Sequence, residues 1–91
     1  MTIYKYKIDP FNIEYEIPKG GKVLCVKEQD NDPFIWILVD PIAELEIRRF
    51  LVIPTGDNVI GDNLNYIGSF QLYKNDIHFS EFVGHLFELL W

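Results

Sequence analysis

Residues 33–56 read PFIWILVDPIAELEIRRFLVIPTG and hold the two longest apolar strand candidates of the chain. Residues 34–39 are apolar at every position, which is typical of a central strand covered on both faces or of a strand with one face at a subunit contact. Residues 44–53 alternate with period two, and their β-branched end favours a strand over the helix that IAELEIRRFL could also form. We expect further strands laid against this pair.

Period-two patterns of β-branched and aromatic residues predict these further strands. They cover residues 2–8, 12–17 and 22–29 before the central stretch and residues 64–74 after it. Turn-forming sequences rich in Pro, Gly, Asp and Asn separate them. Gly68 predicts a bulge or a close backbone approach within the last of these strands. Residues 80–91 fit either a closing strand or a short helix, which Gly84 would weaken by about 1 kcal/mol.

The length of 91 residues and an apolar share of 48% indicate one globular domain over residues 1–91. We predict a mainly β fold of about six to eight strands, arranged as a small antiparallel sheet, a sandwich or a partly open barrel. The small core and the many aromatic side chains favour a homodimer or larger homo-oligomer. The N-terminus lacks the features of a signal peptide, and no apolar run approaches the ~20 residues of a membrane span, so we expect a cytoplasmic protein without membrane contact.

Charge and motif content exclude several classes of function. The net charge of −6 has the wrong sign for a DNA- or RNA-binding protein, so we expect no nucleic-acid partner. Cys25 lies in the apolar run VLCV and is expected to be a buried thiol. His78 and His85 have no partners at metal-ligand spacing, so we expect no metal site and no cofactor, with His85 half-buried and hydrogen-bonded. Since no acid/base pair, nucleophile motif or phosphate loop is present, we predict that the protein is not an enzyme.

The residue types that remain suit the binding of a nucleotide. A flat aromatic ring can stack on a base, and an arginine fork or the backbone N–H groups of a glycine loop can meet phosphate. Arg48 and Arg49 point to opposite faces of their strand, so only one of them is expected to contact the ligand. A core of aromatic rings with solvated arginines is the structural alternative. The predicted ligand-binding residues are Trp36, Arg48, Arg49, Thr55, Gly56 and Tyr66.

Five blocks of the sequence carry a family resemblance: IPKG (17–20), WILVDP (36–41), RRFLVIPTG (48–56), YIGSFQL (66–72) and FVGHLFE (82–88). In this order they resemble a family of small uncharacterised phage proteins with the pattern PKG, W-x-L-V-D-P, R-x-F with T-G, Y-I-G-T-F-Q and H-x-F-E. The blocks span nearly the whole chain. The chain departs from the family at Gly21, where alanine is frequent, at residues 75–80 and in its Leu90-Trp91 tail. The resemblance implies that residues 82–88 form a strand rather than a helix.

The resemblance also implies a function. Small phage proteins often counter host defences, and some act as sponges for cyclic nucleotide signals. The family resemblance thus implies a protein that sequesters a cyclic dinucleotide such as cyclic GMP-AMP without cleaving it, and so blocks a cyclic-oligonucleotide-based defence of the host. A two-fold protein dimer would suit a two-fold ligand. The alternatives are an inhibitor that contacts a host protein through its acidic surface and a minor structural component of the virion.

Overall fold

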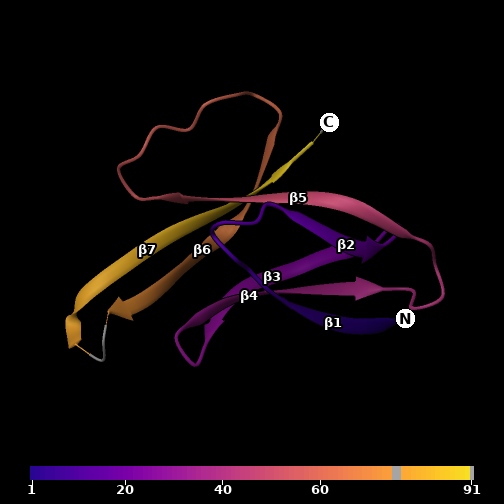
Figure 1. Ribbon diagram of the computed structural model, residues 1–91, viewed down its shortest axis with the longest axis horizontal. Coiled ribbons are helices and arrows are strands. Elements are labelled where there is room, and N and C mark those ends of the chain that lie inside the picture. Colours follow the sequence, from indigo (N-terminus) through magenta and orange to yellow (C-terminus); the bar gives the residue numbers. More distant parts are fainter. Residues whose placement is uncertain (75–76, 91) are drawn as a thin grey trace.

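The computed structural model describes the backbone of residues 1–74 and 77–90 and the side chains of residues 1–73 and 82–90. Over this part of the chain every regular element is a strand (Figure 1). The strands are β1 (Thr2–Lys7), β2 (Glu14–Pro18), β3 (Lys22–Gln29), β4 (Asp32–Val39), β5 (Leu45–Pro54), β6 (Leu64–Lys74) and β7 (Ile77–Leu89). The predicted β fold is confirmed, and its C-terminal segment is a strand, as the resemblance implied.

The strands form two antiparallel sheets. In the three-stranded sheet, β4 lies between β1 and β3, so its predicted central position is confirmed. Only one of its faces is buried, because every second side chain of β4 stays half-exposed. The four-stranded sheet has the order β2-β5-β7-β6. Neither sheet closes into a barrel within the described residues, and apolar side chains from both sheets share one core. The protein is therefore a sandwich of two sheets, one of the three architectures predicted from the sequence.

The central stretch of the sequence carries the chain from one sheet to the other. β4 belongs to the three-stranded sheet and β5 to the four-stranded sheet, so the two strands that we expected to form a pair do not hydrogen-bond to each other. The turn between them is built on Asp40. Its side-chain Oδ1 accepts a hydrogen bond from the N–H of Ile42 at 3.2 Å, and its carbonyl accepts one from Ala43 at 3.1 Å. Asp40 is therefore a turn residue, as its position before a proline predicts.

Alternate side chains of β4 point into the space between the sheets. Ile35, Ile37 and Val39 are fully buried there. They pack with apolar side chains of the second sheet, and the core consists of Ile8, Ile17, Val26, Ile35, Ile37, Val39, Phe50, Phe70 and Leu86. Burial of this apolar surface is the dominant favourable term in the folding of such a domain.

The two sheets approach most closely along β3 and β6. The pairing of β6 with β7 shifts register between Tyr66 and Gly68, so a bulge lies at the predicted position. A Cβ atom on Gly68 would lie 3.0 Å from Cγ1 of Val26 on β3. The predicted bulge is therefore confirmed, and the atom that approaches this glycine closely belongs to a side chain rather than to another backbone segment.

The longest loop of the chain is a crossover connection. β5 and β6 both run antiparallel to β7, so they are parallel to each other. Parallel strands cannot be joined by a tight hairpin. Residues 55–63 therefore carry the chain back along the length of the sheet as an exposed loop (Figure 1).

Candidate functional site

The outer face of the three-stranded sheet carries aromatic side chains between two rows of lysines. Residues directly opposite each other in antiparallel strands share a face of the sheet. Lys7 on β1 and Lys27 on β3 both lie opposite Phe34 on β4, whereas Trp36 lies between Lys5 on β1 and Cys25 on β3. We call this surface the Trp36 face, and its residues are Ile3, Lys5, Lys7, Lys22, Cys25, Lys27, Gln29, Asp32, Phe34, Trp36 and Leu38.

The charge of the Trp36 face is opposite to that of the whole chain. Four lysines and one aspartate lie on it, which gives a local charge of +3 on a protein whose net charge is −6. Nζ of Lys7 lies 3.5 Å from Oδ2 of Asp32. Nζ of Lys5 lies 4.7 Å from the centre of the Phe34 ring and donates a hydrogen bond of 2.7 Å to Oε1 of Gln29. Like charges gathered on one surface attract a ligand of the opposite sign.

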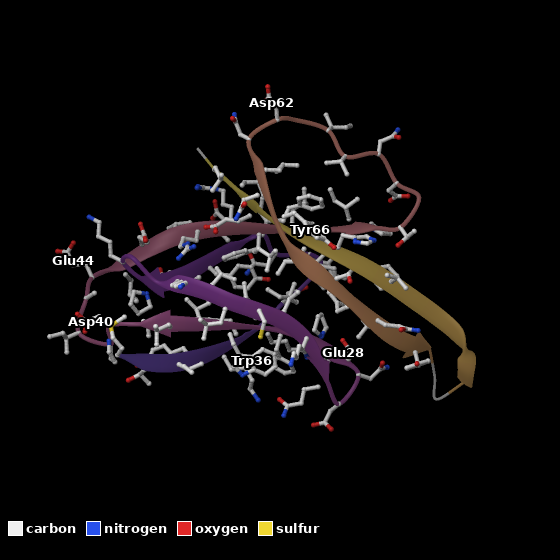
Figure 2. The ribbon with its side chains drawn as sticks, turned by 180° about the vertical axis from the view of Figure 1, so that it is seen from behind. Glu28, Trp36, Asp40, Glu44, Asp62 and Tyr66 are labelled. Carbon is white, nitrogen blue, oxygen red and sulfur yellow. The ribbon has the colours of Figure 1, made fainter. Side chains whose placement is uncertain are left out.

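The rings of this face are partly accessible. Phe34 and Trp36 are half-buried, and their ring centres lie 6.0 Å apart at an angle of 55°. Figure 2 shows Trp36 among the strands of the three-stranded sheet. Cys25, which we expected to be buried, is a half-buried free thiol opposite Trp36. Aromatic faces beside lysines can hold a base by stacking and a phosphate by charge.

Two of the four lysines share this face only because β3 contains a bulge. Lys22 and Lys27 are five residues apart, and strict alternation would place them on opposite faces. The register shifts between Val23 and Cys25, so Leu24 is an extra residue that restores the alternation to the same side. The lysine rows were not predicted from the sequence for this reason and because the overall charge is negative. In the sequence, the two-residue spacing of Lys5 and Lys7 indicated that these two lysines share one face of a strand.

Thr55 and Tyr66, two of the predicted residues, meet through His85 on the outer face of the four-stranded sheet. Oγ1 of Thr55 lies 2.8 Å from Nε2 of His85, and the Tyr66 hydroxyl lies 3.2 Å from Nδ1. Oγ1 of Thr55 also donates to the carbonyl of Val83 at 3.3 Å. All groups are satisfied when His85 donates from Nε2 to Thr55 and accepts from Tyr66 at Nδ1. His85 is half-buried and hydrogen-bonded, as expected, and it fixes the start of the crossover loop to the sheet.

Arg48 points into the protein, where its donors are engaged. Nε and Nη2 donate to the two carboxylate oxygens of Glu88 at 2.7 and 2.9 Å, and Nη1 donates to the carbonyl of Gly21. The side chains of Arg48 and Glu88 are only 16% and 10% exposed. The hydrogen bond to Glu88 is the main cause of the raised pKa of Arg48. This bidentate pair joins β5 to β7 and ties both to the turn before β3.

Arg49 points to the opposite face of β5, as alternation predicts. Its Nη2 lies 3.0 Å from Oε2 of Glu14 on the neighbouring strand β2. A cleft of about 200 Å³ lies near both arginines, and its lining includes the acidic residues Glu46 and Glu88. This volume is below the ~300–1,000 Å³ of typical ligand pockets.

The six predicted residues are therefore divided among three places. Arg49, Thr55 and Tyr66 share the outer face of the four-stranded sheet, and Gly56, with φ of 96°, begins the crossover loop beside Thr55. Trp36 lies on the other outer face of the sandwich, and Arg48 lies between the sheets. Figure 2 shows the separation of Trp36 from Tyr66. The Trp36 face combines rings and positive charge most completely, because lysines lie on both sides of Phe34 and Lys5 lies opposite Trp36.

Among the described side chains, no three or more His, Cys, Asp or Glu residues lie in a group that could hold a metal ion. The described part of the chain also contains no helix long and apolar enough to cross a membrane.

Comparison with curated proteins and with solved structures finds no match to this sequence. Comparison with family models finds a match. The model described as "Domain of unknown function (DUF7352)" matches residues 1–90, nearly the whole chain, and the protein belongs to this family.

Proposed function

We propose that the protein binds a nucleotide on the Trp36 face and holds it without chemical change, and that the ligand is a cyclic dinucleotide such as cyclic GMP-AMP. The observation that carries the proposal is the position of Phe34 and Trp36 between two rows of lysines. Stacking of a base on an aromatic ring contributes about 1–3 kcal/mol, and lysines on either side of the ring are placed to meet the phosphates.

The shape of the face favours a compact ligand over a long nucleic acid. The face is three strands wide, or roughly 10 Å between the lysine rows of β1 and β3. A duplex would meet the negative charge of the rest of the chain beyond these rows. A cyclic dinucleotide presents the same base-and-phosphate unit twice, so two copies of the protein would bind one ligand molecule, in keeping with the expected homodimer.

The proposed biological role rests on the resemblance of the sequence to small phage proteins. A phage protein that binds a cyclic dinucleotide tightly lowers its free concentration in the host cell and so blocks the defence that this signal activates. Such a sponge requires affinity and no catalytic group.

Isothermal titration of the full chain tests the proposal. The ligands are cyclic GMP-AMP, cyclic di-AMP, the linear dinucleotide pApA and a short single-stranded oligonucleotide. We expect a cyclic dinucleotide to bind at half a molecule per chain, to bind more weakly as salt is added, and to be recovered intact. Trp36→Ala should weaken binding at least about fivefold, which corresponds to the loss of about 1 kcal/mol of stacking.

Matched charge reversals locate the site. Lys27→Glu should weaken binding because Lys27 lies on the Trp36 face, whereas Lys19→Glu makes the same change in the turn before β3 and should not. Equal effects of the two reversals would contradict the proposal. Loss of binding with Tyr66→Ala but not with Trp36→Ala would move the site to the other sheet. Tighter binding of the oligonucleotide than of any cyclic ligand would assign the face to single-stranded nucleic acid, and no binding at all would leave the host-protein inhibitor as the better hypothesis.

A further inference from the structure

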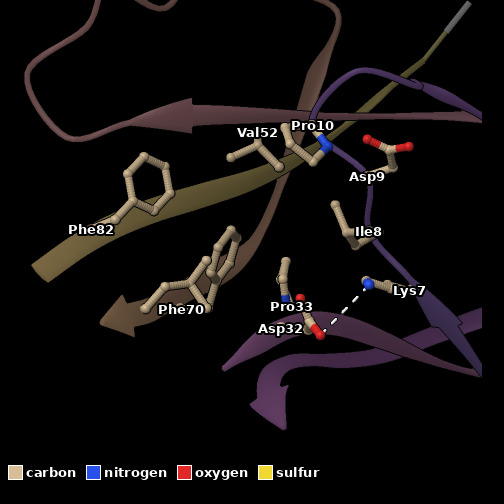
Figure 3. A pocket seen from close by; sticks show the side chains of 10 residues that line it. Lys7, Ile8, Asp9, Pro10, Asp32, Pro33, Val52, Phe70 and Phe82 are labelled. Atoms are coloured by element: carbon tan, nitrogen blue, oxygen red, sulfur yellow. Dashed lines mark ion pairs between the residues drawn. The ribbon is translucent and has the colours of Figure 1, made fainter. Parts of the chain in front are cut away.

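A groove opens between the two sheets and is lined by residues of both. Its volume is about 780 Å³, within the range of typical ligand pockets. Figure 3 shows it from close by. The residues that line it are Lys7, Ile8, Asp9, Pro10, Asp32, Pro33, Val52, Phe70, Leu72 and Phe82.

The walls of the groove are apolar and partly aromatic. Ile8 and Phe70 are buried members of the core, so the floor of the groove is continuous with the core of the protein. The rings of Phe70 and Phe82 lie 6.2 Å apart at an angle of 43°. Gly84 makes this arrangement possible, because a Cβ atom there would lie 2.6 Å from Cζ of Phe70. An apolar ring or short chain in the groove would therefore bury its surface against carbon atoms on several sides.

The rim of the groove carries more negative than positive charge. Lys7 faces Asp32 at 3.5 Å, so its ammonium is already paired. Asp9 adds a second carboxylate, whose Oδ1 accepts a hydrogen bond of 2.9 Å from the N–H of Phe11. Figure 3 shows Asp9 and the Lys7–Asp32 pair at the same side of the groove. One ammonium and two carboxylates give the rim a charge of −1, which disfavours an anionic ligand.

We propose that this groove is a second binding site, for a small apolar molecule, preferably aromatic, that carries an amine. The ring lies against Phe70 and Phe82, and the protonated amine lies near the rim carboxylates. The apolar part of this site is distinct from the nucleotide site, because it lies between the sheets whereas the rings of the Trp36 face point away from the core. The two sites share Lys7 and Asp32 at the rim.

Three naphthalene derivatives that differ only in the head group test the proposal. We expect naphthylmethylamine to bind most tightly to the full chain at pH 7, naphthalenemethanol less tightly and naphthoate most weakly, as measured by the change in naphthalene fluorescence. Val52→Trp should fill the groove and weaken binding of the amine at least about tenfold. Val59→Trp makes the same change in the exposed crossover loop and should leave binding unchanged.

Asp32→Lys provides a second variant at an exposed position, so it tests the proposal even where Val52→Trp disturbs folding. It makes the rim charge positive and should lower the preference for the amine over the carboxylate at least about tenfold, because each charge about 5 Å away in water changes affinity about fourfold. Absence of binding by all three compounds, equal binding of amine and carboxylate, or equal effects of Val52→Trp and Val59→Trp would overturn the proposal. Val52→Trp should leave cyclic dinucleotide binding unchanged.

Discussion

The two adjacent arginines of β5 have different environments because alternation sends them to opposite faces. Arg48 forms a nearly buried bidentate pair with Glu88, while Arg49 forms a more exposed pair with Glu14. The sequence predicted that the two arginines would differ. It could not predict which one points inward, because the partner Glu88 lies 40 residues away and its position depends on the pairing of β5 with β7.

Loss of Arg48 should destabilise the protein far more than loss of Arg49. Arg48→Ala leaves the carboxylate of Glu88 buried without its partner, and breaking such a pair costs about 3–5 kcal/mol. Arg49→Ala removes an ion pair that is partly screened by water and should cost less than about 1 kcal/mol. Urea unfolding followed by circular dichroism measures both. Similar losses for the two variants would show that the internal pair does not stabilise the fold.

The positions of the strands could be predicted from the sequence, but their arrangement into sheets could not. Alternation and turn composition are local signals, so the strands covering residues 22–29 and 64–74 were predicted with their observed bounds. Membership of a sheet depends on contacts between distant residues, so the separation of β4 and β5 into different sheets was missed. The bulge at Leu24 was missed as well, because no glycine marks it. It decides where Lys22 points and therefore completes the candidate site.

The side chain of Asn31 connects the turn between β3 and β4 to the second sheet. Asp30 and Asn31 have positive φ angles of 53° and 61°, as a type I′ turn requires. The amide of Asn31 donates to the carbonyl of Tyr73 at 2.5 Å and accepts from its N–H at 2.7 Å, so it bridges the turn to β6. The pair Asp-Asn marks the turn in the sequence, but the bridge to β6 could not be predicted from it.

Asn31→Gly should therefore lower stability although glycine suits the backbone of this turn. Two hydrogen bonds are lost at about 0.5–1.5 kcal/mol each, so the melting temperature should fall by roughly 4–20 °C. Asp30→Gly makes a comparable change at the neighbouring position and should shift the melting temperature much less. Equal shifts in differential scanning calorimetry would mean that the turn conformation, rather than the bridge, is what Asn31 contributes.

In the whole molecule, folding gathers on one outer face positively charged residues that lie among acidic residues in the sequence. Five of the six lysines are spread over the first 27 residues among acidic neighbours, and the net charge of −6 hides them. Folding brings four of them onto one outer face around Phe34 and Trp36, while Arg49, Thr55 and Tyr66 come to lie on the other. The sequence supplied the residue types of a nucleotide site, but only the sheet arrangement shows which of them are neighbours.

An amide-resolved NMR titration of the full chain with cyclic GMP-AMP tests nucleotide binding on the Trp36 face most directly. We expect the largest shifts at Lys5, Cys25 and Trp36, including the indole N–H of Trp36, with small shifts at Thr55 and Tyr66. Shifts concentrated at Thr55 and Tyr66, or an unchanged spectrum at millimolar ligand, would contradict the assignment of nucleotide binding to the Trp36 face.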